Sequence, residues 1–546
     1  MFRFRLSCFA LISILLLAGA AWSQDLCAEP VKTVSGLVRG KTGADGKTCS
    51  WKGIPFAAPP VGELRFKAPQ PAPAWTGVRE ASDFGHVCMQ VLGGDEVKKN
   101  MSEDCLYLNI WRPIQDPARP APRLRGVMVW IHGGGYIMGS GGKSGATGVS
   151  FDGARLVEAG DVVVVTINYR LHAFGFLADP ALRAEDPNHS TGNYGSLDQV
   201  AAIRWVHDNI AAFGGDPAKV TIFGQSAGGW SICTMLATPL NQGMFQRAIL
   251  ESGGCTKSED LDKGYERAKT IAKRVGCAPG DLACLRRAPA KKFLGGLGDV
   301  YREGMPYGPH HDGYLLTGTP LAMIREGHYN AVPLLAGSTR NEVDAVLFFR
   351  PSLWRALPFQ YERRAQSNLA LTDEETRRLI TLYPLDQFGN KPKKAFGRIF
   401  TDASLACPTY LGLAAATEHQ PDAFLYRFDY DDNKYGKHIG ALHAMEVPFV
   451  FNTVEGSKGY QKHLPEAREL ARVMQGYWTN FAKTGDPNGP GLPPWPKFDP
   501  QNQSRQVLDT EIKTEPASMQ DRCSFWDDYL QHHRGFEETL AGPQKK

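Results

Sequence analysis

The stretch TIFGQSAGGW, from Thr221 to Trp230, decides the fold. Val220 to Phe223 form a short apolar run that is typical of a buried strand, and small residues that favour a helix follow Ser226. Gly224 and Gly228 leave room for a tight turn from which the serine hydroxyl projects. The pattern predicts a nucleophile elbow, in which a serine at a strand-to-helix turn attacks a carbonyl carbon.

The alternative is an ordinary glycine-rich turn between a strand and a helix. The chain has 58 glycines in 546 residues, so a Gly-x-Ser-x-Gly match can arise by chance. The elbow is therefore a hypothesis that needs a sheet around it and catalytic partners elsewhere in the chain.

Apolar runs of strand length recur on both sides of the elbow, and strands buried on both faces of a parallel sheet have this composition. A helical pattern opens at Ser196 and closes near Gly215. The alternation of strand and helix predicts an α/β fold with a large, mostly parallel sheet flanked by helices. With the predicted elbow, the expected architecture is an α/β hydrolase. The predicted strands are 127–131, 161–167, 220–223, 247–251, 332–336 and 424–428.

Two long segments, at about 256–326 and 344–420, contain helical patterns and few strands. We expect them to be insertions that wall the active site and not separate domains. One α/β-hydrolase domain is assigned to residues 24–535, and the tail 536–546, rich in charged residues and glycine, is expected to be disordered.

The first residues resemble a secretory signal peptide. Two arginines precede an apolar run from about Phe9 to Leu17, and small residues follow it. This run is shorter than the roughly 20 residues that a membrane-spanning helix needs. We therefore expect a leader at 1–23, cleaved near Ser23 and Gln24, no stable membrane anchor, and a secreted or periplasmic protein.

Composition excludes few functions but argues against a nucleic-acid partner. The net charge is +4, with 42% hydrophobic and 22% charged residues, as in an ordinary soluble globular protein. Oligomeric state is left open.

The chain has eleven cysteines, of which Cys8 lies in the leader. An oxidising compartment would pair the others as disulfides. No Cys-x-x-Cys spacing and no regular Cys and His cluster is present, so we expect no metal and no other cofactor. Short separations suggest the pairs Cys27–Cys49, Cys88–Cys105 and Cys277–Cys284.

A serine nucleophile needs a histidine base and an acid that orients the histidine. In α/β hydrolases these follow the serine in the order acid, then histidine. Glu342 comes just after the predicted strand 332–336, and His443 lies on a loop beyond strand 424–428. The competitors are Asp344 for the acid, and His310, His311 and His438 for the base.

Acyl transfer also needs donors for the oxyanion. The sequence IHGGGY, from Ile131 to Tyr136, follows directly after a predicted strand. Main-chain N–H groups of Gly134 and Gly135, with that of Ala227, are the expected oxyanion hole. The alternative is a flexible glycine loop.

Together these stretches closely resemble the type-B carboxylesterase family, which includes cholinesterases, bile-salt-activated lipase, fungal lipases and bacterial para-nitrobenzyl esterases. The resemblance spans nearly the whole mature chain. The motifs that carry it include GIPFAAPPVGELRF (53–66), EDCLYLNIW (103–111), HGGGY, VVVVTINYRLHAFGFL (162–177), GQSAGG and the H-x-x-E-x-P-F-V-F that begins at His443.

The resemblance implies a triad of Ser226, Glu342 and His443, with oxyanion donors at Gly134, Gly135 and Ala227. It also implies an ion pair between Arg65 and Glu103 and disulfides Cys88–Cys105, Cys277–Cys284 and Cys407–Cys523. Cys233 and Cys255 have no matched partners and are left either free or paired together.

Two departures from the family pattern are informative. The loop from Cys88 to Cys105 contains no Trp, Tyr or Phe, whereas cholinesterases stack choline on a tryptophan there, so choline esters are not expected to be preferred. Gln225 replaces the common glutamate before the nucleophile, which removes a negative charge close to His443.

The resulting expectation is a secreted serine carboxylesterase that hydrolyses small-molecule carboxylic esters through a Ser226 acyl-enzyme. The alternatives are a non-catalytic cholinesterase-like adhesion module and a lipase that acts on longer acyl chains. Acyl and alcohol preference stay open, as do an apolar cleft near Phe348 and Phe349 and glycosylation at the sequons of Asn100, Asn188 and Asn502.

Overall fold

The computed structural model describes residues 27–91, 95–114, 124–142, 149–295, 307–347, 350–432, 436, 440–456 and 464–533. The expected leader (1–23) and tail (536–546) lie outside the described residues. So do His438, Phe348 and Phe349.

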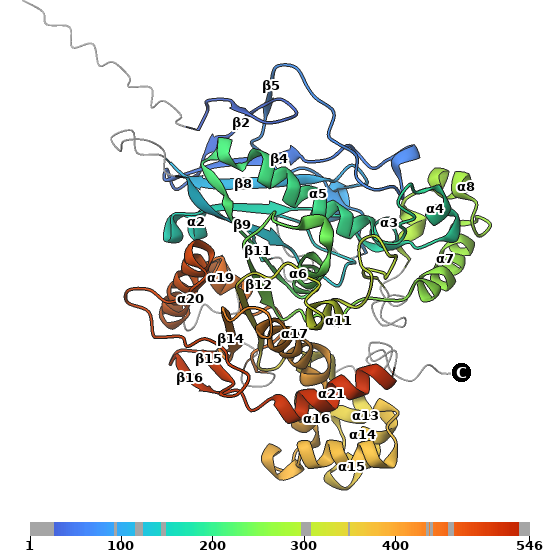
Figure 1. The fold of residues 1–546 in the computed structure, drawn as a ribbon, viewed down its shortest axis with the longest axis vertical. Helices are drawn as coiled ribbons and strands as arrows, with labels where there is room; N and C mark the ends of the chain where they lie inside the picture. The colour runs from blue at the N-terminus through green and yellow to red at the C-terminus, as the bar shows by residue number, and fades with distance from the viewer. Residues whose placement is uncertain are drawn as a thin grey trace, which may run out of the picture.

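An eleven-stranded sheet runs through the described part of the chain in the order β16-β15-β14-β13-β12-β11-β9-β10-β8-β4-β3 (Figure 1). The strands from β10 to β15 in that order are parallel, and antiparallel strands complete both edges. The bounds are β3 Lys41–Thr42, β4 Thr48–Pro55, β8 Tyr107–Pro113, β9 Arg125–Ile131, β10 Val163–Ile167, β11 Gly215–Gln225, β12 Arg247–Glu251, β13 Leu334–Thr339, β14 Ala423–Phe428, β15 Ser504–Leu508 and β16 Lys513–Pro516.

Each of the six predicted strands forms, and the predicted α/β-hydrolase architecture is confirmed. The run from Val127 to Ile131 is completely buried in β9, as expected of a central parallel strand. The strand predicted at 161–167 begins two residues late, because Asp161 adopts a left-handed conformation (φ 50°) that ends the preceding helix.

Helices cover both faces of the sheet, and each layer buries its own apolar core (Figure 1). On one face, Trp130 of β9 packs against Phe223 and Phe451 with ring centroids 4.9 and 5.1 Å away. That layer contains α2 Ala154–Gly160, α19 Val447–Val450 and α20 Leu464–Thr484, and the opposite layer contains α3 His172–Phe176, α5 Tyr194–Asn209, α6 Ala227–Ala237, α11 Pro320–Arg325 and α17 Cys407–Thr417.

The segments expected as insertions are mainly helical, but α17 packs directly on β13 and β14 and so belongs to the layer that covers the sheet. Helices α13 to α16 and α21 form a group at one end of the molecule (Figure 1). The remaining helices are α1 Asp95–Asn100, α4 Pro180–Glu185, α7 Leu261–Val275, α8 Leu282–Arg287, α9 Lys291–Leu294, α12 Asp344–Leu347, α13 Pro351–Trp354, α14 Tyr361–Leu369, α15 Asp373–Leu382, α16 Pro392–Thr401 and α21 Gln520–His532.

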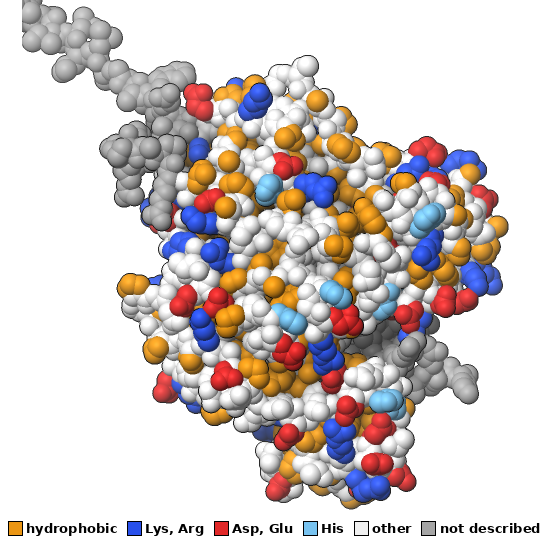
Figure 2. All heavy atoms as spheres, in the orientation of Figure 1, with side chains coloured by type: hydrophobic (Ala, Val, Ile, Leu, Met, Phe, Trp, Pro, Cys, Tyr) orange, Lys and Arg blue, Asp and Glu red, His pale blue; other side chains and the backbone are white. Residues whose placement is uncertain are grey.

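Short strands form two small sheets beside the main one. They are β1 Val31–Lys32, β2 Leu37–Arg39 and β5 Val78–Glu80 in one, and β6 Val87–Cys88 and β7 Met101–Ser102 in the other. None of the helices in the described part of the chain combines the length and the apolar composition that a bilayer crossing needs. Figure 2 shows acidic and basic side chains interspersed over the visible face.

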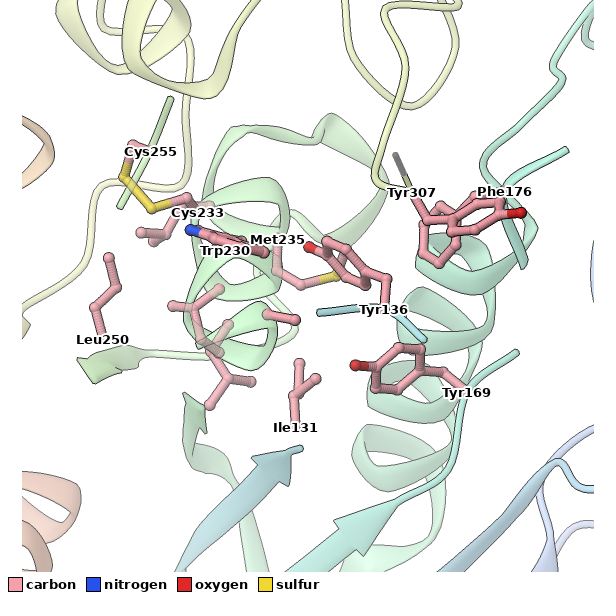
Figure 3. Packing of buried hydrophobic residues seen from close by; sticks show 14 of the residues in the cluster. Ile131, Tyr136, Tyr169, Phe176, Trp230, Cys233, Met235, Leu250, Cys255 and Tyr307 are labelled. Atoms are coloured by element: carbon pink, nitrogen blue, oxygen red, sulfur yellow. A yellow bond between two sulfur atoms is a disulfide. The ribbon is translucent and has the colours of Figure 1, made fainter. Parts of the chain in front are cut away.

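Five disulfides cross-link the described residues. Besides the pairs expected from the sequence, Cys233 and Cys255 are joined, which places a bridge between α6 and the segment after β12 (Figure 3). The other pairs are Cys27–Cys49, Cys88–Cys105, Cys277–Cys284 and Cys407–Cys523.

The ion pair that the resemblance implied is present and largely buried. Arg65 Nη2 lies 2.5 Å from Glu103 Oε1, and Arg65 Nε donates to Glu103 Oε2 at 2.7 Å. The remaining guanidinium nitrogen donates to the carbonyls of Leu285 and Ala288. One side chain therefore fastens the N-terminal region to the end of α8.

Removing the disulfide Cys407–Cys523 is expected to destabilise the fold more than removing Cys277–Cys284. The first pair is separated by 116 residues and the second by 7. Loop-closure entropy alone gives about 5 kcal/mol for the longer loop and about 2.4 kcal/mol for the shorter one. Urea unfolding of the Cys407→Ala/Cys523→Ala and Cys277→Ala/Cys284→Ala proteins measures both, and equal or inverted losses would contradict this account.

Candidate active site

Ser226 lies in the turn between the end of β11 and the start of α6. Its backbone has φ 59° and ψ −122°, a conformation that costs a non-glycine residue about 1–3 kcal/mol. Two main-chain hydrogen bonds hold it there. Its N–H donates to the carbonyl of Glu251 at 2.8 Å, and its carbonyl accepts from the N–H of Trp230 at 2.9 Å. The strained turn is thus fastened to the neighbouring strand β12 and to the first turn of α6.

Close packing of α6 against β9 fixes the direction of this turn. A Cβ atom at position 228 would lie 2.0 Å from the carbonyl oxygen of Ile131, so only glycine fits there. All residues of α6 are buried, which makes the helix a rigid support for the serine.

Glu342 and His443 lie on the loops that follow β13 and β14. Glu342 Oε2 lies 2.6 Å from His443 Nδ1, and Glu342 Oε1 accepts from the N–H of Thr339 at 2.6 Å. The glutamate side chain is fully buried, whereas the histidine side chain is 32% exposed. Since Nδ1–H donates to the carboxylate, Nε2 is left as the nitrogen that can accept a proton.

A main-chain contact ties the two loops together. The N–H of Asn341 donates to the carbonyl of Ala441 at 2.9 Å, and Asn341 pairs with Leu442 in an isolated parallel bridge. Glu342 and His443 are the next residues in their loops. The distance between acid and base is therefore set by the backbone as well as by the side chains.

Gln225 lies beside the histidine ring. Its Nε2 is 3.3 Å from His443 Nε2 and 3.5 Å from His443 Nδ1. Within the described residues, no hydrogen bond joins His443 to the hydroxyl of Ser226. Contacts between nucleophile and base are often long in unliganded sites and shorten when substrate binds. The structure brings acid and base together and places the serine next to a residue that touches the base.

The competing candidates lie elsewhere. Asp344 packs on α16, where a Cβ at Gly397 would be 2.6 Å from its Oδ1, and burial raises the pKa of Asp344 to about 6. His310 is buried with Nδ1 3.1 Å from the carbonyl of Gly192, and burial lowers its pKa to about 4. His311 contacts polar side chains of the loop before α7.

The glycine loop after β9 runs against the elbow. A Cβ at Gly133 would lie 3.0 Å from Ser226 Cβ, and Gly134 and Gly135 have left-handed φ values of 112° and 61°. In the part of the chain that the structure describes, no hydrogen bond takes up the N–H of Gly134, Gly135 or Ala227. Three main-chain donors without partners therefore lie in the two segments that meet at the serine.

His132 and Tyr169 support this loop, a role that the sequence pattern did not reveal. The rings stack with centroids 4.4 Å apart, and the Tyr169 hydroxyl donates to the carbonyl of His132 at 2.8 Å. The imidazole Nδ1 donates to the carbonyl of Gly133 at 2.8 Å. Burial lowers the pKa of His132 to about 4, so the ring is neutral at pH 7. The loop is thus held in place without adding a positive charge.

Two further buried glutamates, Glu251 and Glu446, lie close to the candidate triad and were also missed. Both side chains are fully buried. The available signal was a charged residue at the end of an apolar strand, RAILE, and another within the motif that begins at His443.

Comparison with known proteins identifies the family. The carboxylesterase family model matches residues 28–526. Para-nitrobenzyl esterase of Bacillus subtilis is 35% identical over an alignment that covers 89% of this chain and 96% of the relative. Human cocaine esterase is 33% identical over 96% of this chain and 95% of the relative.

Solved structures give the same assignment. A carboxylesterase of Geobacillus stearothermophilus superposes with a TM-score of 0.77 at 34% sequence identity, covering 91% of this chain and 99% of that structure. A thermophilic para-nitrobenzyl esterase gives a TM-score of 0.76 at 32% identity, covering 91% of this chain and all of that structure. The chain belongs to the carboxylesterase family and is a carboxylic ester hydrolase.

Proposed function

We propose that this protein is a secreted serine carboxylesterase that acts through an acyl-enzyme on Ser226. The observation that carries the proposal is the 2.6 Å contact between Glu342 and His443, on loops tied together beside the strained serine turn. This is the geometry in which a buried acid orients a histidine base toward a nucleophile.

In the first half-reaction, the Ser226 hydroxyl attacks the ester carbonyl while His443 Nε2 accepts its proton. Glu342 stabilises the imidazolium that forms, and the same proton then passes to the departing alcohol. In the second half-reaction, water attacks the acyl-enzyme and His443 again accepts and returns the proton. Carboxylic acid leaves, and the serine is regenerated.

The three unpaired main-chain donors fit the oxyanion of each tetrahedral intermediate. Donors that are already oriented stabilise the developing negative charge without reorganising during the reaction. The stacked pair His132 and Tyr169 keeps the glycine loop in register with the elbow.

Secretion is supported by the five disulfides, since such bonds persist in oxidising compartments. The expected leader agrees with it. Among substrates, neutral esters are favoured over choline esters, because the loop from Cys88 to Cys105 supplies no aromatic ring for a quaternary ammonium.

Ser226→Ala is expected to lower kcat for para-nitrophenyl butyrate by about 10⁴-fold or more and to abolish covalent labelling by a fluorophosphonate. His443→Ala is expected to cause a loss of similar size, whereas His311→Ala, the matched control, keeps wild-type activity. Labelling of the Ser226→Ala protein at the wild-type rate would refute the assignment.

Gly134→Ala is expected to lower kcat by about 10²–10³-fold with a smaller effect on KM, because the new Cβ would lie 2.2 Å from the carbonyl of Met138 and displace an oxyanion donor. Gly62→Ala is the control, since Gly62 is also left-handed but has open space around it. Circular dichroism checks that both variants fold, and equal kcat values in the two would argue against the oxyanion role.

Gln225→Glu is expected to move the acidic limb of the kcat/KM profile upward by about one pH unit, because a carboxylate beside His443 would favour the imidazolium. The exposed substitution Gln242→Glu adds the same charge away from the site and should leave the limb in place. An unmoved limb in the Gln225→Glu protein would rule out the effect.

A further inference from the structure

Three glutamates, one of them the proposed acid Glu342, are buried close to one another at the proposed triad. Glu251 ends β12, Glu342 follows β13, and Glu446 directly precedes α19. The side chains of Glu251 and Glu446 are fully buried, as is that of Glu342. Only Glu342 has the partners that an ionised carboxylate needs, namely the Thr339 N–H and the His443 ring.

Glu251 connects the nucleophile to the opposite helical layer. Its main-chain carbonyl accepts the N–H of Ser226 at 2.8 Å. Its side-chain Oε1 accepts from the indole N–H of Trp478, in α20, at 2.7 Å. One residue thus holds the strained serine through its backbone and is itself anchored through its carboxyl group.

The second oxygen of this carboxyl group is unsatisfied. In the described part of the chain, Glu251 Oε2, Glu446 Oε2 and the Tyr426 hydroxyl are buried and have no hydrogen-bond partner. Glu446 Oε1 accepts from the Ser252 hydroxyl at 3.2 Å, and neither Glu251 nor Glu446 forms an ion pair with a described residue. Burying three anions together without a cation is very unfavourable, and a carboxyl group in such a place keeps its proton instead.

We propose that Glu251 is a neutral carboxylic acid in the working enzyme and a positioning residue for the triad, which leaves Glu342 as the ionised acid that faces His443. The inference rests on the proposed triad. Its chemistry is simple: a protonated Glu251 accepts the Trp478 N–H through Oε1 and carries its proton on the otherwise unsatisfied Oε2. A second anion beside Glu342 would instead alter the charge that His443 experiences.

The titratable groups around Glu251 are consistent with a retained proton. They are Tyr426 on β14, Glu446 before α19, and the Glu342–His443 pair. The residues that face Glu251 from β11, β13 and α20 carry no charge; they are Gln225, Gly337 and Trp478. Burial raises the pKa of Glu251 to about 8, and burial with the neighbouring carboxylates raises the pKa of Glu446 well above its ordinary value.

The sign of the effect on stability follows. Because the pKa of Glu251 is higher in the folded protein than the ordinary value of 4.5, the folded state binds the proton more tightly. Below pH 4.5 the carboxyl group is neutral in both the folded and the unfolded protein, and its contribution to folding stability is fully present. The free energy of unfolding then falls as the pH rises from 4.5 through about 8. Glutamine at this position can still accept the Trp478 N–H and cannot ionise, so this loss should disappear.

The test measures the thermal unfolding midpoint of the full chain from pH 5 to 10, and kcat/KM for para-nitrophenyl butyrate over the same range. Between pH 5 and 9, the unfolding midpoint of wild type should fall by about 3–4 °C more than that of Glu251→Gln. Trp478→Phe removes the donor that favours the anion and should shift this fall upward by roughly half a pH unit. The exposed substitution Glu362→Gln is the control and should follow wild type.

The acidic limb of kcat/KM gives the second readout. If Glu251 is neutral, Glu251→Gln removes no charge and the midpoint of this limb stays within about 0.2 pH unit of wild type. A shift of the limb to lower pH would overturn the proposal. So would unfolding midpoints that change with pH in the same way in wild type and Glu251→Gln. The melting result needs no catalysis, so it stands even if Ser226 proves not to be the nucleophile. If Glu251→Gln does not fold, the direction of the Trp478→Phe shift decides.

Discussion

The parallel alignment of β11, β12 and β13 is the constraint on which the proposed chemistry depends. Gln225 pairs in register with Glu251, and Glu251 pairs with Gly337 on the next strand. The carboxyl ends of the three strands therefore lie side by side at one end of the sheet, and the residues that follow them lie close together. The proposed nucleophile and the proposed acid are more than a hundred positions apart in sequence, yet both follow strands that end at this same end of the sheet.

The elements at this end of the sheet also hold the strained backbone of Ser226 and the buried carboxylate of Glu342 in place. Ser226 keeps a strained backbone because its N–H is taken up by β12 and its carbonyl by α6. The acid loop and the histidine loop are joined through Asn341 and Ala441. Strain and a buried carboxylate persist here because the surrounding elements over-determine the positions of these residues.

Much of the fold followed from composition along the chain. Central parallel strands such as β9 and β10 are apolar throughout, so their positions could be predicted closely. Strands β4, β8 and β16, toward the two edges of the sheet, were not predicted, because they are antiparallel and carry polar residues that make them resemble loops. Strand β15, which is parallel to β14, was missed because its sequence SRQVL begins with polar residues. Helix α17 was assigned to an insertion because its alanine-rich sequence gives no sign of the strands that it covers.

The candidate site residues that directly follow predicted strands could be located from the sequence. Glu342 and His443 follow their strands, and the structure places them in contact. The sequence left open whether Cys233 and Cys255 are free or paired, and the structure pairs them. The contact of Gln225 with His443 and the indole of Trp478 beside Glu251 were not predictable. Each depends on how helices and loops from distant segments pack, and neither spacing nor periodicity records that.

The strand order has a consequence for biosynthesis. From β11 to β15, each strand lies beside the one that precedes it in the chain. A polypeptide that emerges with its N-terminus first can therefore add every new strand to an open edge, without threading it between strands already paired. The proposed triad is completed only when His443 emerges, so an unfinished chain with a formed elbow would lack the proposed base.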